Sequence, residues 1–322
     1  MSQQNSMVLL EDFVIQSERN LRNGHPNPSG SFSTLILRIA LAAKLIKNSV
    51  ARAGIDQHLG LTGQENLHGD LVKILDAEAE QIFERILAQM TNVYLFASEE
   101  QDFVVPQFSE GEYIVVFDPI DGSSNIETGW LLGSTFGIYR KTSAKPFEVT
   151  HLYQLPSDMV AAGYIMYGTR TVFMYTTGNG VHHFELHPEI NEFVIINPMV
   201  HIPQNGTLLS ANLAYLFKWE TWVQKYILTL LKTQRYSQRY SGTLVADIHR
   251  LLHEGGIFIY PGAKLRRPYE IDVITLLIHQ AGGFSFSGRN NLMESTPTSL
   301  HQQSPFFAFG PGNLENFMAF AP

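Results

Sequence analysis

The spacing of hydrophobic positions changes several times along the chain, and each change predicts an element. Over residues 31–53 apolar side chains recur at steps of three and four, the period of a helix with one buried face. Residues 113–117 are a short, nearly continuous apolar run, as expected of a strand that is covered on both faces. Comparable patterns predict further strands at 134–140, 159–167, 171–177, 181–186 and 257–260, and further helices from near Asp76 and at 214–232, 241–253 and 270–280.

Helices and strands interleave in this prediction, which favours a layered α/β fold. Residues 55–70 are rich in glycine and polar side chains, so we expect a mobile loop there. Proline, asparagine and glycine residues between 197 and 206 indicate a boundary. We therefore expect an N-terminal domain at residues 1–200 and a C-terminal domain at residues 201–322.

Charge and composition limit the classes of function. The net charge of −8 argues against a nucleic-acid surface, which needs a basic footprint, and it requires local positive charge around any phosphate-bearing substrate. The chain has no cysteine, which excludes disulfides, thiolate nucleophiles and thiol-based regulation. Residues 1–13 do not resemble a signal peptide, and no apolar run approaches the length of a membrane span. We expect a cytoplasmic protein.

Residues 118–125 carry the first candidate chemistry. Asp118 and Asp121 follow a predicted strand directly, and α/β sheets gather ligand chemistry at the carboxyl ends of strands. Together with the Ile120 carbonyl they offer an all-oxygen environment that suits Mg²⁺ or Mn²⁺. From Gly122 onward the chain resembles a helix start, whose free N–H groups accept phosphate. An ordinary β-turn with a helix cap has the same pattern, so this segment alone leaves both interpretations open.

Other acidic residues stand at comparable positions. Glu99 and Glu100 end a second predicted strand, Asp70 and Asp76 flank the start of a helix, and Glu270 opens a late helix. Each has an ordinary explanation as a solvated pair, a helix cap or a first-turn acid. They form one site only if the fold brings them together, which their spacing does not show.

A set of further segments narrows the interpretation. The set consists of residues 66–70, 98–100, 117–125, 137–140, 161–164, 239–240, 245–250, 255–261 and 264–266. Together, in this order, they resemble class I fructose-1,6-bisphosphatase. The resemblance covers nearly the whole chain from about residue 30. It implies a layered αβαβα sugar-phosphatase fold with two sheets and with helices between and outside them. The N-terminal domain would carry regulatory-type helices and the metal-site sheet, and the C-terminal domain would bind substrate.

The resemblance also implies a role for each matching residue. Two or three Mg²⁺ ions, or Mn²⁺, would be held by Glu99, Asp118, the Ile120 carbonyl, Asp121 and Glu270, with Asp70 as a further ligand. The attacking water would be activated by Glu100 and Asp76. The 1-phosphate would lie on the backbone of Asp121, Gly122, Ser123 and Ser124. The 6-phosphate and sugar would contact Asn212, Tyr215, Tyr240, Tyr260 and Lys264. Arg239 would reach into the site of a neighbouring subunit, which implies a homotetramer or at least a dimer.

The implied activity is Mg²⁺-dependent hydrolysis of fructose 1,6-bisphosphate to fructose 6-phosphate and phosphate, in gluconeogenesis or a related sugar-phosphate pathway. Sedoheptulose 1,7-bisphosphate and inositol phosphates are alternative substrates, and the residues from Asn212 to Lys264 favour a bisphosphate sugar over an inositol monophosphate. A non-catalytic relative is the alternative from a different class. Such a protein would usually lose a metal ligand or the water-activating acid, and no matched residue is missing here.

Two features depart from the family pattern or invite another interpretation. The AMP site of animal members has an acid in the segment that corresponds to residues 29–33 and a lysine where Glu112 stands, so we expect weak or absent AMP inhibition. Several histidines invite a zinc interpretation. His182, His183 and His187 lack an acidic or cysteine partner at ligand spacing, so we interpret them as surface or packing residues, and Glu254 stands in the wrong place for His249 and His253 to form a zinc-protease motif.

Overall fold

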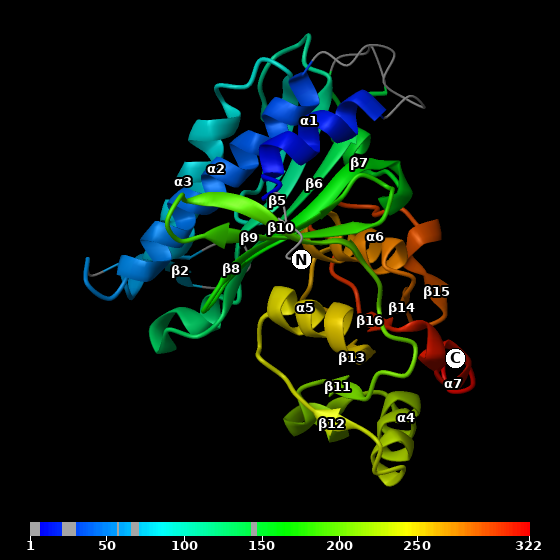
Figure 1. Cartoon of the computed structure of the whole chain (residues 1–322). Helices are drawn as coiled ribbons and strands as arrows, with labels where there is room; N and C mark the ends of the chain where they lie inside the picture. The colour runs from blue at the N-terminus through cyan, green and yellow to red at the C-terminus, as the bar shows by residue number, and fades with distance from the viewer. Residues whose placement is uncertain (1–6, 21–29, 57, 66–70, 143–146) are drawn as a thin grey trace, which may run out of the picture.

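A mixed eight-stranded sheet forms the centre of the larger half of the molecule (Figure 1). The structure is a computed structural model and describes residues 7–20, 30–56, 58–65, 71–142 and 147–322. The strand order is β10-β9-β8-β7-β6-β5-β3-β4, and the β3–β5 pair is parallel while the other pairs are antiparallel. The strands are β3 (Val93–Ser98), β4 (Val105–Pro106), β5 (Tyr113–Asp121), β6 (Leu132–Arg140), β7 (Met159–Tyr167), β8 (Thr171–Thr176), β9 (Val181–His187) and β10 (Glu192–Val200).

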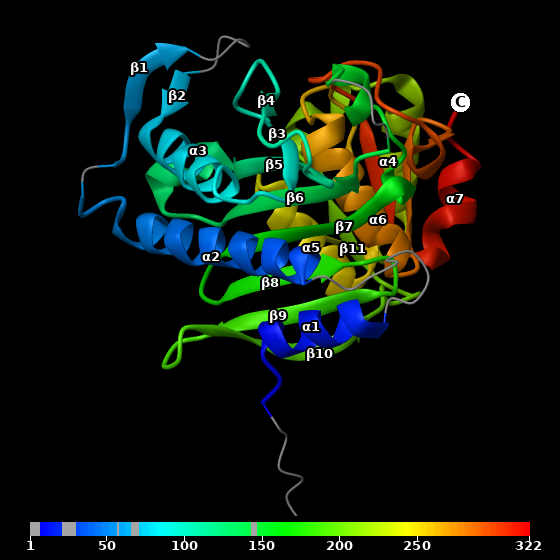
Figure 2. The ribbon, with the colours of Figure 1, turned by 90° about the horizontal axis from the view of Figure 1, so that it is seen from above.

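Three helices cover one face of this sheet. They are α1 (Leu10–Asn20), α2 (Ser31–Arg52) and α3 (Ile74–Leu87), and Figure 2 shows them lying across the strands. Their apolar faces form a common core with the sheet, in which the rings of Phe83 and Phe117 stack with centroids 4.5 Å apart. This packing fixes the first turn of α3 beside the carboxyl end of β5, where the acidic residues lie.

Two helices separate the large sheet from a second sheet. They are α5 (Leu244–Glu254) and α6 (Asp272–Gln280), and both contact strands of each sheet (Figure 1). The approach of α5 is close, because a Cβ on Gly133 of β6 would lie 2.6 Å from Val245 Cβ. Glycine at this position therefore lets the first turn of α5 rest directly on the large sheet.

The second sheet has six strands in the order β12-β11-β13-β16-β14-β15. Its strands are β11 (Leu208–Ser210), β12 (Ser237–Gln238), β13 (Gly256–Tyr260), β14 (Phe284–Ser287), β15 (Asn290–Asn291) and β16 (Phe306–Phe309). The outer helices are α4 (Thr221–Lys232) and α7 (Leu314–Met318), whose apolar side chains pack with the far face of this sheet. The predicted αβαβα layering is confirmed. The predicted domain boundary at residue 200 stays a prediction.

Three predictions of local structure were wrong in part. Residues 55–70 are not a loop throughout, because β1 (Leu61–Glu65) pairs with β2 (Leu71–Lys73). The predicted helix 214–232 is two elements, η4 (Leu213–Lys218) and α4, because the backbone is extended at Trp219 and Glu220. The late helix begins three residues early, with the π-helical turn η5 (Arg267–Ile271).

Strand β10 was not predicted, because Asn197 and Pro198 indicate a boundary in sequence. An edge strand tolerates proline, since one side of its backbone pairs with no other strand of the sheet, and β10 is an edge strand whose outer bridge, from Val194 to Leu9, does not involve Pro198. The Pro198 carbonyl has a side-chain partner there, because it accepts a hydrogen bond from His182 Nδ1 at 2.6 Å. Among the described residues, none of the helices combines the length and the apolar character that crossing a membrane requires.

Candidate active site

A cavity of about 780 Å³ lies where the large sheet, the first turn of α5 and the second sheet meet. Fifteen of the residues that the sequence singled out line this one cavity. They are Asp76, Glu99, Glu100, Asp118, Ile120, Asp121, Gly122, Ser123, Ser124, Asn212, Tyr215, Tyr240, Tyr260, Lys264 and Glu270. Arg239 is exposed outside the cavity, and Asp70 lies outside the described residues. The fold therefore brings together segments that are up to about 190 positions apart in sequence, as the numbers of Asp76 and Glu270 show.

Three buried carboxylates meet at one end of the cavity. Each of Asp118, Asp121 and Glu270 offers an oxygen that lies within 4.8 Å of the others. The first two come from the end of β5, whose pairing with β6 is irregular between Asp118 and Asp121, and Glu270 comes from η5. This irregularity lets both aspartates of one strand face the same point, although residues three apart in a regular strand face opposite sides.

Burial and mutual repulsion raise the pKa of each of these carboxyl groups. The pKa of Asp118 lies well above its ordinary value because of burial and the negative charges of Glu270 and Asp121. Burial raises the pKa of Glu270 to about 7 and that of Asp121 to about 6. Backbone N–H groups of Val245 and Leu244 donate to Asp121 at 2.6 and 3.1 Å and partly offset its shift.

The donor set fits a hard divalent cation. All three groups are oxygen donors, and they lose the free energy of hydration on burial without a cationic partner that could balance all three. A divalent cation among them would remove the repulsion that raises the pKa values. The cluster can therefore hold a metal ion, and its oxygen chemistry favours Mg²⁺, Ca²⁺ or Mn²⁺ over softer metals.

Glu99 lies beside this cluster but has a different partner. Its carboxylate forms an ion pair with the Arg266 guanidinium, and both side chains are almost buried. The Arg266 backbone N–H donates to Glu270 Oε2 at 2.6 Å, so one residue contacts two of the predicted metal ligands. The Ile120 carbonyl accepts a hydrogen bond from Ser123 Oγ at 3.3 Å. The ligand roles of Glu99 and of this carbonyl stay predictions.

The turn after β5 is shaped by Gly122. Its φ angle of 90° is one that side chains rarely adopt, and a Cβ there would lie 2.5 Å from Thr243 Oγ1. The Thr243 hydroxyl is fixed by a bond to Leu131 O at 2.7 Å and by the Asn125 amide, which donates to it at 2.7 Å. Glycine therefore allows the phosphate-binding candidate segment to rest against the start of α5.

Asp76 and Glu100 also line the cavity, and Asp76 contacts the turn that follows β5. Asp76 stands in the first turn of α3 and accepts a hydrogen bond from Ser123 Oγ at 3.1 Å. Burial, and then the negative charge of Glu100, raise the pKa of Asp76 to about 7. A carboxyl group whose pKa is raised to about 7 at a cavity wall, beside a second carboxylate, is suited to proton transfer near neutral pH.

Tyrosines and a lysine also line the cavity. Burial raises the pKa of Tyr240 to about 12 and raises that of Tyr260, so both phenols stay protonated and can donate hydrogen bonds. Lys264 and Asn212 line the same cavity, as does Tyr215, which is about half exposed. Uncharged donors and one cation are an environment suited to an anionic group.

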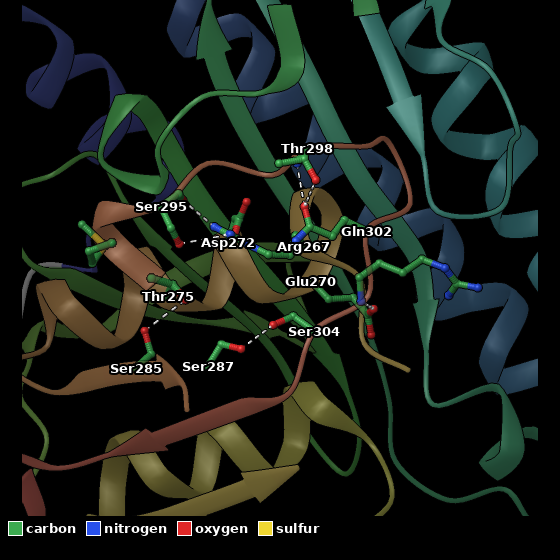
Figure 3. Close-up of polar contacts among 12 residues, drawn as sticks. Arg267, Glu270, Asp272, Thr275, Ser285, Ser287, Ser295, Thr298, Gln302 and Ser304 are labelled. Carbon is green, nitrogen blue, oxygen red and sulfur yellow. Dashed lines mark hydrogen bonds and ion pairs between the residues drawn. The ribbon is translucent and has the colours of Figure 1, made fainter. Parts of the chain in front are cut away.

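A buried polar network fixes the turn that carries Glu270 (Figure 3). The Arg267 Nε donates to Asp272 Oδ1 at 2.7 Å, and its Nη2 donates to the Ser295 carbonyl at 2.6 Å. Both members of this ion pair are almost fully buried. The network ties η5 and the start of α6 to the loop at Ser295, which limits the positions that the Glu270 carboxylate can take.

Sequence reasoning missed three polar residues of the cavity wall, namely Lys73, Thr243 and Asp247. Asp247 lies within a recognised segment, and its carboxylate accepts from the Ser241 backbone N–H at 3.0 Å. Lys73 precedes α3 by one residue and pairs with Glu127 at 3.4 Å. Asp247 could have been indicated only by its place within the recognised segment 245–250. Lys73 and Thr243 have no distinctive spacing in the sequence.

The histidines lie away from this cavity. His183, His249 and His253 pack together with ring centroids 4.4 to 5.6 Å apart, on the face of α5 that rests on β9. His182 stacks against Phe13, with ring centroids 4.7 Å apart. Within the described part of the chain, the ring nitrogens of these histidines do not form a group of three as close as the acidic cluster.

Comparison with known proteins agrees with this geometry along the whole chain. The family model "Fructose-1-6-bisphosphatase, N-terminal domain" matches residues 8–198, and "Fructose-1-6-bisphosphatase, C-terminal domain" matches residues 202–320. A class 1 fructose-1,6-bisphosphatase of Chloroherpeton thalassium is 36% identical, with 94% of this chain and 89% of the relative covered. The cytosolic enzyme of Solanum tuberosum is also 36% identical, with 89% and 88% covered.

A solved structure extends the agreement to three dimensions. The holo form of Leishmania major fructose-1,6-bisphosphatase superposes with a TM-score of 0.90 at 34% identity, and the match covers 98% of this chain and 99% of that one. Identity above 30% over nearly the full length, together with the two family models, shows common descent. The chain belongs to the class I fructose-1,6-bisphosphatase family.

Proposed function

We propose that the chain hydrolyses the 1-phosphate of fructose 1,6-bisphosphate and releases fructose 6-phosphate and inorganic phosphate. One observation carries the proposal. A single cavity is lined both by a cluster of buried carboxylates, suited to cations and to hydrolysis, and by a second set of groups that includes Tyr240, Tyr260 and Lys264. A substrate with a phosphate at each end needs two such regions, whereas a monophosphate needs only the first. Family membership supports the same substrate.

The acidic end is the proposed metal site. Asp118, Asp121 and Glu270 would hold the first ion, and Glu99, Asp70 and the Ile120 carbonyl would complete a site for two or three Mg²⁺ ions. When bound, such cations stabilise the negative charge that develops on the attacking and leaving oxygens of a phosphate monoester. Mn²⁺ prefers the same ligands and is expected to substitute.

The protein's own groups would supply binding and proton transfer. The backbone of residues 121–124 would receive the 1-phosphate, because this turn lines the cavity beside the carboxylate cluster. Glu100 and Asp76 would orient the attacking water and accept its proton. The pKa of Asp76, about 7, is well placed for this step because a base near the ambient pH can both accept and release a proton.

The second phosphate would be held without reacting. Protonated Tyr240 and Tyr260 would donate hydrogen bonds to it, with Asn212 and Tyr215, while Lys264 would approach the sugar. Arg239 is exposed, and its Nη1 donates to the Gln238 carbonyl at 2.8 Å. We propose that Arg239 completes this end in the site of a second copy, within a homotetramer.

A substrate panel tests the proposal. Phosphate release should be measured with Mg²⁺ on fructose 1,6-bisphosphate, sedoheptulose 1,7-bisphosphate, fructose 6-phosphate and an inositol monophosphate. We expect fructose 1,6-bisphosphate to give the highest kcat/KM, and Glu100→Gln to lose most activity while Glu112→Gln, outside the cavity, keeps it. Absence of Mg²⁺-dependent release from every bisphosphate would refute the enzyme assignment, and an active Glu100→Gln variant would refute the proton acceptor.

Two further proposals concern assembly and regulation. Mixing Arg239→Ala with Glu100→Gln subunits tests the shared site, because hybrids should recover activity only if Arg239 acts on a neighbour.

AMP inhibition is expected to be weak, because the Glu112 carboxylate stands 4.0 Å from Arg140 and lowers the local positive charge. A micromolar AMP inhibition constant would contradict this. Some relatives are named cytosolic, which supports the proposed cytoplasmic location.

A further inference from the structure

Glu80 is a buried carboxyl group that none of the roles above uses. It lies on α3 one turn after Asp76, and only 8% of its surface is exposed. Ser98 Oγ, at the end of β3, donates a hydrogen bond of 2.5 Å to Glu80 Oε2. Within the described residues, Glu80 Oε1 has no hydrogen-bond partner. Burying a carboxyl group with half of its acceptors unused is costly, so its retention needs a reason.

The other contacts of Ser98 indicate that reason. The Glu100 backbone N–H donates to Ser98 Oγ at 3.2 Å, so the hydroxyl links Glu80 to the turn that carries Glu99 and Glu100. The Glu99 N–H donates to Phe117 O at 3.0 Å, which fixes the other side of the same turn. A serine hydroxyl has one proton. When the Ser98 proton points toward Glu80, a lone pair of Ser98 Oγ can accept the hydrogen bond from the Glu100 N–H.

From this relay we infer that Glu80 is a positioning residue for the reaction proposed above, acting through Ser98 on the turn that places Glu99 and Glu100. The inference rests on the proposed function of that turn. Glu80 is not among the residues that line the cavity, and its hydrogen bond to Ser98 connects it to the turn. Burial raises its pKa to about 8, so at neutral pH it can fill this role without adding a negative charge beside Glu100.

The same helix provides a matched control. Glu78 accepts a hydrogen bond from Ser49 Oγ at 2.7 Å, which is the same pair of groups in a contact away from the cavity. Glu80→Ala and Ser98→Ala are therefore compared with Glu78→Ala and Ser49→Ala. Any general loss of α3 stability should appear in both pairs, whereas a loss of positioning should appear only in the first.

We expect Glu80→Ala and Ser98→Ala each to lower kcat roughly 10- to 100-fold with little change in KM, since a turn displaced by about 1 Å costs that much. Both should also raise the Mg²⁺ concentration for half-maximal activity. The double variant should be no worse than either single one, because both remove one contact. Glu80→Gln keeps an acceptor for Ser98 and should recover most of kcat, with a flatter decline above pH 8.

Three results would overturn the inference. The first is a kcat and a Mg²⁺ requirement in Glu80→Ala that equal those of Glu78→Ala. The others are additive losses of kcat in the double variant and a kcat that Glu80→Gln does not recover. Should Glu80→Ala not fold, Ser98→Ala alone decides, because it leaves the buried carboxyl in place. Wild-type protein without activity would refute the proposed function instead. The positioning of Glu99 would then be judged by how much Mg²⁺ raises the unfolding temperature of each variant.

Discussion

Two clusters of buried titratable side chains contact the same helix and respond to burial in opposite directions. At the start of α5, the backbone N–H groups of Leu244 and Val245 donate to Asp121 of the acidic cluster. In its second half, His249 and His253 pack against His183 of β9. Burial raises the pKa of the acids and lowers the pKa of His183, to about 4, and of His249. In both clusters burial favours the uncharged form.

The difference between the clusters lies in their partners. Tyr164 OH meets His249 Nδ1 at 2.8 Å, and His253 Nδ1 donates to the His249 carbonyl at 2.8 Å, so two of the three imidazoles have neutral partners within the protein. Asp118 is surrounded by other carboxylates, whose charges raise its pKa further. Close carboxylates are a liability in an isolated protein and an advantage when a cation is bound. On this comparison we propose that the unbalanced acidic cluster is the functional one.

Removing one charge from the acidic cluster gives the largest expected effect. Asp118→Asn should lower kcat/KM on the order of 1,000-fold, because a lost cation contact is worth several kcal/mol in the transition state. In EDTA at pH 8, the same variant should unfold at a higher temperature than wild type, since one repelling buried charge is gone. Phosphate release and thermal unfolding measure the two effects. A variant less stable than wild type in EDTA would break the comparison.

The pH dependence of stability should differ with and without Mg²⁺. Asp76 has a folded pKa of about 7 against an ordinary 3.8, so the stability it contributes is complete below pH 4 and is lost as the pH rises through 7. The loss is on the order of 4 kcal/mol for this group alone. Chemical unfolding in EDTA should therefore show falling stability between pH 5 and pH 8, and Mg²⁺ should restore it most at pH 8. Equal stabilisation by Mg²⁺ at pH 5 and pH 8 would contradict the proposed site.

The histidine cluster should show the opposite slope. His183 has a folded pKa of about 4 against an ordinary 6.5, so its contribution is present above pH 6.5 and is lost as the pH falls toward 4. We expect roughly 2 kcal/mol, allowing for partial screening by solvent, and His183→Leu should remove this part of the slope. Unfolding of both proteins between pH 7 and pH 4.5 measures it. Mg²⁺ should leave this difference unchanged.

The smallest expected effect concerns the neutral partner of His249. Tyr164→Phe removes one buried hydrogen bond and should cost about 1 kcal/mol in unfolding free energy, with little dependence on pH. Activity at saturating Mg²⁺ should stay at the wild-type level, because Tyr164 is outside the cavity. A large loss of activity in this variant would show that the two clusters are coupled through α5.

Much of the fold follows from the pattern of the chain. The strand at Met159–Tyr167 and the helix at Ser31–Arg52 lie within a residue of their predicted bounds, because their periodicity is regular. The predictions failed where a long-range contact overrides the local pattern. The edge position of β10 tolerates Pro198, and the pairing of β1 with β2 orders part of a glycine-rich segment. Neither contact can be recognised from neighbouring residues.

The candidate site divides in the same way. The sequence by itself identified the family and indicated the candidate residues for the chemistry, because residues 118–125 and the later segments carry the resemblance. Tertiary structure decided that Asp118, Asp121 and Glu270 meet, that Arg266 pairs with Glu99, and that Ser98 donates to the buried Glu80. The physical reason is that charge repulsion and desolvation act over a few ångströms in space. Only the folded chain fixes those distances.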